Sequence, residues 1–148
     1  METKIPPPIV TLAFGLAIYF SRGMFPTFEA WHSFYLGIFL LFLGFSILVS
    51  AVRLFRKDKT TVNPLSPDQA TKLVTDGIFK YSRNPMYLGM AVVLSSIAVF
   101  FNLLGGIILI ALFCAYITRF QIIPEERAMR DLFSDDFDKY IKETRRWV

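Results

Sequence analysis

The chain contains very little that could hold a metal ion or form a disulfide bond. Its 148 residues include one histidine, His32, and one cysteine, Cys114. A single cysteine excludes a disulfide within the chain and leaves the redox compartment open. One histidine, one cysteine and no suitable spacing of carboxylates are too few ligands for zinc. We therefore expect no metal site.

Charged side chains are also missing from three long stretches, residues 9–20, 34–52 and 84–118. The chain as a whole is 54% hydrophobic, with a mean hydropathy of +0.48. A small soluble domain has too much surface to bury 16 phenylalanines, so the pattern indicates lipid as the solvent. Transporters usually keep a charge within their spans, so its absence counts against a proton-coupled transporter.

The first two charge-free stretches each predict one membrane span. Residues 34–52 are long enough to cross a hydrocarbon core of about 30 Å. Residues 9–20 are short and follow Lys4, which also suits a signal peptide. The residues after them do not resemble a cleavage site, so we predict a retained first span.

The third stretch, residues 84–118, would reach roughly 50 Å as one helix, far more than a bilayer thickness. It therefore predicts two spans that form a tight helical hairpin. Asn102 and the pair Gly105 and Gly106 tolerate turn geometry, so we expect the reversal there. Ahead of the hairpin, Pro64 and Pro67 exclude one continuous helix through the start of the polar loop.

The basic residues indicate the orientation of the spans. Only Lys4 and Arg22 precede Arg53, whereas seven basic residues lie between Arg53 and Arg83 and seven more follow residue 118. Lysine and arginine favour the cytoplasmic side, so four spans place both termini there. Because the basic residues are interleaved with acids in short loops, we do not expect nucleic acid as a partner.

The C-terminal residues are charged and predict two short amphipathic helices. Pro124 suits the first turn of a helix, and Glu125 and Glu126 suit its positive end. Ser134, followed by Asp135 and Asp136, suits the N-cap of a second helix. The predicted fold class is therefore all-α. We expect a multi-pass transmembrane protein of about four spans, with a C-terminal helical hairpin and cytoplasmic amphipathic helices.

Polar side chains gather at both ends of the predicted hairpin, and an antiparallel hairpin brings its ends together. Each of these side chains suits a structural role as well as a role in a binding or catalytic site. Arg83 is also a suitable charge anchor at the membrane surface, and Tyr81 and Tyr87 are suitable interfacial aromatics. Glu125 and Glu126 are also ordinary acids at a helix start.

The order of these residues resembles the signature of one family of integral-membrane methyltransferases. Its members include isoprenylcysteine carboxyl methyltransferase and phospholipid N-methyltransferase. The signature has Gly, Tyr and Arg-His-Pro-x-Tyr-x-Gly, then a hairpin, a Glu-Glu pair and a Phe-Gly-x-x-Tyr segment. In this chain the matching residues are Gly77, Tyr81, Arg83, Asn84, Pro85, Tyr87, Leu88, Gly89, Glu125, Glu126 and the segment 133–140.

The resemblance covers about residues 60–148, with two departures from the signature. Asn84 stands in place of the usual histidine, and Ser134 in place of the usual glycine. Asparagine donates and accepts hydrogen bonds but carries no proton at neutral pH, so we expect only a hydrogen-bonding role at position 84. Serine lacks the conformational freedom of glycine at positive φ, but it can cap the next helix. We therefore expect the serine to have little effect on the match to the family.

The resemblance implies that S-adenosylmethionine binds where the two ends of the hairpin meet. Glu125 or Glu126 would accept its ammonium group or ribose hydroxyls, and Arg83 would pair with its carboxylate. Arg83 and Glu126 are the expected catalytic residues. The expected cofactor-binding set is Gly77, Tyr81, Asn84, Pro85, Tyr87, Leu88, Gly89, Glu125 and Glu126, and the expected substrate pocket includes Tyr140 and Arg145.

The resemblance further implies a lipid-soluble or amphiphilic methyl acceptor. From the charge distribution we expect the active site at the cytoplasmic face, and we expect a prokaryotic cell membrane. We expect one membrane domain, with two N-terminal spans in residues 1–57 and a methyltransferase-like catalytic region in residues 58–148. Two alternatives stay open: an NADPH-dependent membrane reductase of the sterol reductase type, and a non-enzymatic scaffold or small transporter. Neither the acceptor nor the oligomeric state follows from the residues.

Overall fold

The computed structural model describes residues 5–26, 31–58 and 71–148. The predicted positions of Lys4, Pro64 and Pro67 lie outside these ranges. Within them every regular element is helical and there is no strand. The predicted all-α fold class is confirmed.

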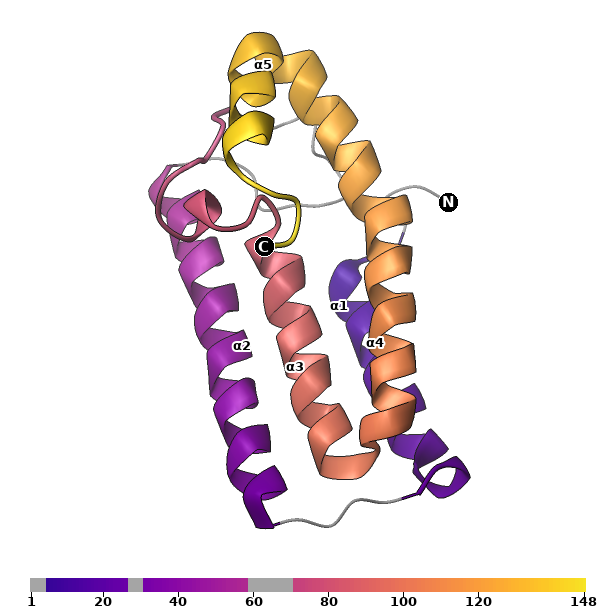
Figure 1. Ribbon diagram of the computed structural model, residues 1–148. Helices are drawn as coiled ribbons and strands as arrows, with labels where there is room; N and C mark the ends of the chain where they lie inside the picture. Colours follow the sequence, from indigo (N-terminus) through magenta and orange to yellow (C-terminus); the bar gives the residue numbers. More distant parts are fainter. Residues whose placement is uncertain (1–4, 27–30, 59–70) are drawn as a thin grey trace.

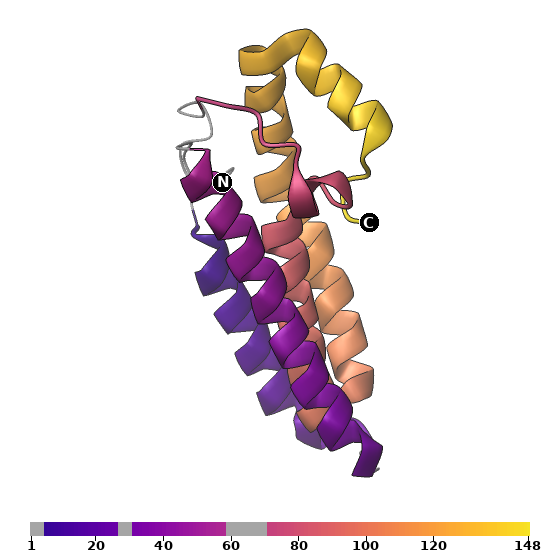
Figure 2. The same cartoon turned by 90° about the vertical axis from the view of Figure 1, so that its left-hand side faces the viewer.

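Four helices lie side by side and form the body of the protein (Figures 1 and 2). They are α1 (Pro7–Phe20), α2 (Trp31–Lys57), α3 (Pro85–Phe101) and α4 (Leu103–Ile117). Short 3-10 turns follow α1 and precede α3, namely η1 (Ser21–Met24) and η3 (Gly77–Lys80). Beyond α4 the chain continues through the π-helical turn η4 (Thr118–Ile122) into α5 (Ile123–Glu143). The helix α3 packs against α1, α2 and α4, so it is the centre of the bundle.

Small residues let α3 approach its neighbours closely. A Cβ atom added to Gly44 of α2 would lie 2.9 Å from the carbonyl oxygen of Gly89 in α3. A Cβ atom added to Gly106 of α4 would lie 2.2 Å from the Cβ of Ala98 in α3. At these two points α3 therefore lies in close contact with α2 and with α4, and dispersion stabilises the contacts.

Apolar side chains cover the outside of the bundle as well as its interior. Leu94, Phe113 and Ile117 are fully buried, whereas Phe20 is 75% exposed and Phe42 is 69% exposed. Helices that are apolar all round are typical of membrane proteins. By length and composition, the helices Ser33–Lys57 and Leu103–Glu143 can each cross a membrane, and Pro85–Phe101 is a shorter apolar helix. These features agree with the predicted class of helical membrane proteins.

The predicted hairpin of α3 and α4 is present, but its turn is shorter than we expected. Asn102 alone separates the two helices. Its side-chain oxygen accepts a hydrogen bond from the backbone N–H of Gly105 at 3.0 Å, which caps α4, and its amide nitrogen donates to Ser21 Oγ at 3.0 Å. The pair Gly105 and Gly106 lies inside α4, where Gly106 serves the contact with α3. The prediction that these glycines form the reversal was therefore wrong.

Pro124 does not begin a separate helix, contrary to the predicted break between the fourth span and the C-terminal segment. In η4 the backbone N–H of Ile123 donates to the carbonyl of Thr118, five residues earlier. Proline has no N–H, and its ring clashes with the carbonyl one turn earlier in an ordinary α-helix. A wider π-helical turn accommodates the ring, so the helix continues through it.

Ser134 interrupts α5 with φ 39° and ψ −112°, and the second half of the helix folds back toward the bundle (Figure 1). A residue with a side chain is strained at such positive φ, typically by about 1–3 kcal/mol. Glycine is not. The prediction that serine has little effect at this position was therefore wrong, because the chain turns at Ser134 itself and not only after it.

Replacing Ser134 with glycine should raise the free energy of unfolding by about 1 kcal/mol, because relief of the strain exceeds the extra entropy of glycine in the unfolded chain. Denaturation of the detergent-solubilised protein measures the change. The matched control is Ser95→Gly inside α3, which should lower the free energy of unfolding by roughly 0.5–1 kcal/mol. A destabilised Ser134→Gly variant would show that the bend does not strain the serine.

Candidate functional site

The predicted site lies where the beginning of α3 meets the beginning of α5. Pro85 is the first residue of α3, and a proline restricts the residue before it to extended backbone. Asn84, with φ −127° and ψ 54°, is neither helical nor fully extended and forms the N-cap. This sharp change of direction leaves Arg83 just outside the helix. Glu125 and Glu126 lie in the first turn of α5, opposite it.

Arg83 joins three segments of the chain. Its Nη2 donates to Glu126 Oε1 at 2.8 Å, and the two side chains are only 9% and 16% exposed. Its Nη1 donates to the carbonyl oxygens of Ile141, at 3.4 Å, and of Thr144. Its backbone N–H donates to the carbonyl of Arg145 at 3.0 Å. The arginine therefore holds the start of α3, the start of α5 and the chain beyond α5 together.

Arg146 completes this arrangement, and the sequence analysis missed it. Its Nε donates to Glu126 Oε1 at 3.0 Å and its Nη2 to Glu126 Oε2 at 2.6 Å, a bidentate pairing. The backbone at Thr144 is extended and its side chain is buried. Beyond Thr144 the side chains alternate: Arg145 is exposed, and Arg146 is partly buried and faces Glu126. That alternation, read from the end of α5, is the signal that could have separated the two arginines.

Glu126 is ionised at neutral pH. Burial alone would raise the pKa of its carboxyl, but the hydrogen bonds from Arg146 and Arg83 outweigh burial and lower the pKa below its ordinary value. Both of its oxygens accept hydrogen bonds from the protein. We refer to Arg83, Glu126 and Arg146 as the Glu126 network.

Glu125 is in a different environment from its neighbour. The hydroxyl of Tyr87, a buried residue of α3, donates a hydrogen bond to Glu125 Oε1. Burial raises the pKa of Glu125 to about 7; the bond from Tyr87 opposes this rise, and the charge of Glu126 adds to it. The Tyr87 bond uses one of the two carboxyl oxygens, so Oε2 can accept from another donor. Glu125, with a pKa of about 7, thus differs from the neighbouring Glu126, whose pKa is lowered.

The other predicted cofactor-binding residues occupy varied positions. Asn84 donates from Nδ2 to the carbonyl of Arg146 at 2.9 Å, so its side chain holds the C-terminal residues. Gly77, at φ 60°, and Gly89 pack against α2. Tyr81 is 76% exposed. Pro85 is buried and Leu88 is partly buried on α3.

The two residues predicted for the substrate pocket differ in burial. The hydroxyl of Tyr140 donates to the carbonyl of Phe79 at 2.6 Å, and Tyr140 belongs to a buried cluster with Phe137 and Ala51. Burial raises the pKa of Tyr140 above its ordinary value, against the opposing charge of Arg83. Arg145 is exposed. Their role at a substrate stays a prediction.

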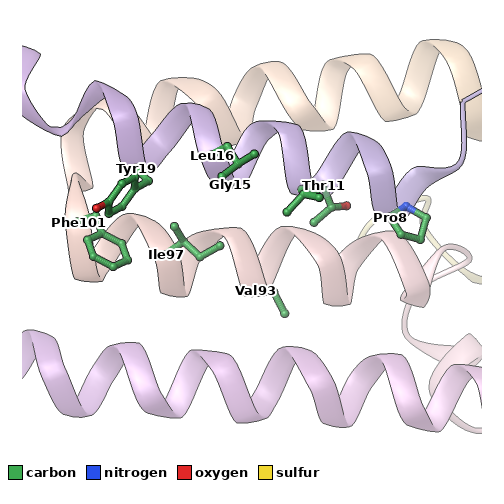
Figure 3. Close-up of a pocket in the computed structure, with 9 residues that line it drawn as sticks. Pro8, Thr11, Gly15, Leu16, Tyr19, Val93, Ile97 and Phe101 are labelled. Carbon is green, nitrogen blue, oxygen red and sulfur yellow. The ribbon is translucent and has the colours of Figure 1, made fainter.

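A separate hollow of about 420 Å³ lies between α1 and α3 (Figure 3). Two residues of α1 bring a hydroxyl group to its lining, Thr11 and Tyr19. The hydroxyl of Thr11 already donates a hydrogen bond to the carbonyl of Pro7 at 2.9 Å. No acidic or basic side chain is among the described residues that line it, apart from the phenol of Tyr19. The lining residues are Pro8, Thr11, Leu12, Gly15, Leu16, Tyr19, Val93, Ile97 and Phe101.

Comparison with known families decides the class of the protein. The sequence profile of the family described as Phospholipid methyltransferase matches residues 32–136, which include Arg83, Tyr87, Glu125 and Glu126. The chain belongs to the phospholipid methyltransferase family. This membership confirms the resemblance found in the sequence and makes the chain a membrane methyltransferase; it does not favour the reductase alternative. No curated protein and no solved structure matches the chain.

In this member of the phospholipid methyltransferase family, Glu125 should make stability decrease as pH rises. From the ordinary glutamate pKa of 4.5 up to about 7, the folded protein keeps a proton at Glu125 that the unfolded chain has released. The free energy of unfolding should therefore fall by up to about 3 kcal/mol over this range. Glu125→Gln, which cannot titrate, should lack this decrease.

Denaturation at a series of pH values between 4.5 and 8 measures the difference between the wild type and Glu125→Gln. Asp131→Asn, at an exposed position of α5, is the control and should follow the wild type. A difference between wild type and Glu125→Gln that stays constant with pH would show that Glu125 has an ordinary pKa.

Proposed function

We propose that the chain is an S-adenosylmethionine-dependent methyltransferase that acts on a lipid-soluble or amphiphilic acceptor at the cytoplasmic face of the membrane. The observation that carries this proposal is the meeting of two motifs far apart in sequence. Arg83 bonds to Glu126, and Tyr87 bonds to Glu125. Four residues that the family resemblance assigns to the site thus lie side by side at one end of the bundle.

The distribution of charge supports the proposed topology. The charged residues of α5 and of the C-terminal end of α2 lie at the end of the bundle that carries the site (Figure 1). At the opposite end, Arg22 is the only charged residue among those described. Because basic residues favour the cytoplasmic side, this supports four spans with the site and both termini in the cytoplasm.

The residues present fit the polar groups of S-adenosylmethionine. Glu125 Oε2 is a suitable acceptor for the ammonium group or a ribose hydroxyl, because Tyr87 occupies only the other oxygen. Both oxygens of Glu126 are already bonded to arginines, so we assign Arg83 and Glu126 the positioning of the site. Gly77, Tyr81, Asn84, Pro85, Leu88 and Gly89 belong to the proposed cofactor-binding set on the evidence of the motif.

When bound, the cofactor supplies a methyl group on a sulfonium, which a nucleophilic oxygen or nitrogen of the acceptor takes by in-line displacement without a metal. Tyr87 and Ile122 belong to one buried apolar cluster, against which Trp147 packs, so the site borders an apolar region. When the cofactor does not occupy Oε2, Glu125, with a pKa of about 7, can take up a proton near neutral pH. This suits an acceptor that must lose a proton, such as the amine of a phospholipid headgroup.

Calorimetry of the purified protein with S-adenosylhomocysteine tests the proposal. The wild type should bind, and Glu125→Gln should bind roughly 10- to 100-fold more weakly, because a charge-assisted hydrogen bond is lost. Glu143→Gln, an exposed change on the same helix, should bind like the wild type. Wild-type protein that gives neither heat nor a shift in melting temperature would contradict the proposal.

Methyl transfer into a membrane lipid extract gives the acceptor. Labelled S-adenosylmethionine should transfer its label to a lipid, and the wild type should exceed Glu125→Gln because Glu125 contributes to cofactor binding. Identification of the labelled product names the headgroup. Label found only in water-soluble products would contradict a lipid acceptor.

A further inference from the structure

We propose that Arg146, and not Arg83, is the residue of this site that binds an anionic oxygen group of a ligand, and that Glu126 orients Arg146 for this role. The anionic group is a carboxylate or a phosphate. The carboxylate of the cofactor is one source, and that part rests on the proposed function. The phosphate of a phospholipid headgroup is the other source.

Arg83 has no capacity for a ligand. Its side chain is 9% exposed, and both of its terminal nitrogens are bonded within the protein, to Glu126 and to two backbone carbonyls. Its Nε atom is fully buried and has no acceptor. A ligand carboxylate could reach Arg83 only if the chain around Ile141 and Thr144 moved away.

Arg146 has that capacity. Its side chain is 38% exposed, four times the exposed fraction of Arg83. The bidentate pairing with Glu126 uses Nε and Nη2, and among the described residues no acceptor is bonded to Nη1. A guanidinium held flat by one carboxylate presents its remaining N–H groups in a fixed direction, which suits the planar or tetrahedral oxygens of an anion.

The backbone at Arg146 is held as firmly as its side chain. Its carbonyl accepts hydrogen bonds from Asn84 Nδ2 at 2.9 Å and from the buried Ser82 Oγ at 3.5 Å. The next residue, Trp147, donates from its indole nitrogen to Thr118 Oγ1 at 3.2 Å. An arginine that served only to solvate the chain end would need none of these bonds. Preorganisation of this kind lowers the entropic cost of binding.

The charges of the site leave room for an anion. Two arginines contact the single carboxylate of Glu126, and Glu125 has a pKa of about 7. The cluster therefore carries an excess of positive charge. Glu125 and Arg146 together offer one acceptor for an ammonium and one donor set for an anion, which suits a zwitterion. The amino-acid part of the cofactor and a phosphoethanolamine headgroup both have this chemistry.

Binding measurements with Arg146→Gln test the assignment. Arg83 remains on Glu126 in this variant, so the fold should persist, and its melting temperature checks that it does. Arg146→Lys keeps the charge but loses the bidentate geometry, so it should bind between wild type and Arg146→Gln. Lys142→Gln removes one positive charge from an exposed position nearby and is the control. Arg145→Gln tests whether the neighbouring arginine, and not Arg146, binds the anionic group.

Two pairs of probes distinguish the sources of the anion. S-adenosylhomocysteine is compared with its decarboxylated analogue, and lysophosphatidylethanolamine in detergent micelles with dodecylamine, which lacks the phosphate. In one of the pairs, Arg146→Gln should weaken binding of the anionic probe roughly 10- to 100-fold and leave its partner unchanged. Which pair responds identifies the carboxylate or the phosphate.

Other outcomes overturn the assignment or the proposed function separately. Wild-type affinity of Arg146→Gln for both anionic probes, or a loss in Arg145→Gln alone, would overturn the role of Arg146. So would wild-type protein that binds neither anionic probe. Wild-type protein that binds only the phospholipid probe would contradict the proposed cofactor, and the phospholipid pair would still decide the role of Arg146.

Discussion

At one end of the bundle, the carboxylate of Glu126 lies between the guanidinium groups of Arg83 and Arg146, at 2.8 and 2.6 Å. Three parts of the chain meet there: the start of α3, the start of α5 and the C-terminal residues. Arg83 and Glu126 are little exposed, and charges in such surroundings are stable only when paired, so removal of Glu126 would leave Arg83 without its partner. Both arginines of the site therefore depend on this one carboxylate for their charge pairing.

The rest of the bundle follows from the exclusion of charge. Helices that face lipid cannot carry unpaired charges, so the titratable residues that form the site collect at an end where water and protein can satisfy them. Contact through Gly44, Gly89 and Gly106 keeps α3 close to α2 and α4. That packing brings Tyr87 of α3 to Glu125 of α5. The two adjacent glutamates then differ: Glu126 is ionised and bonded on both oxygens, whereas Glu125 has a pKa of about 7 and retains one oxygen.

Long-range patterns in the sequence were enough to predict the fold class, the hairpin and the two motifs that meet. Long charge-free stretches indicate helices that face lipid. A helical hairpin brings its two ends together. Local details depended on contacts that a sequence does not display. Gly105 and Gly106 resemble a turn, but Gly106 serves helix packing. Ser134 resembles an N-cap in the sequence, but in the structure the chain turns at Ser134 itself, which has a positive φ. Arg145 and Arg146 are adjacent residues of the same type. The path of the chain beyond α5 determines which of the two contacts Glu126.

The central claim is that Glu126 holds the C-terminal residues over the site. Hydrogen–deuterium exchange of the detergent-solubilised wild type and of Glu126→Gln measures this directly. In the wild type the amides of residues 141–148 should be protected. In Glu126→Gln they should exchange markedly faster, while the amides of α3 and α4 keep their protection. Equal exchange of residues 141–148 in the two proteins would contradict the claim.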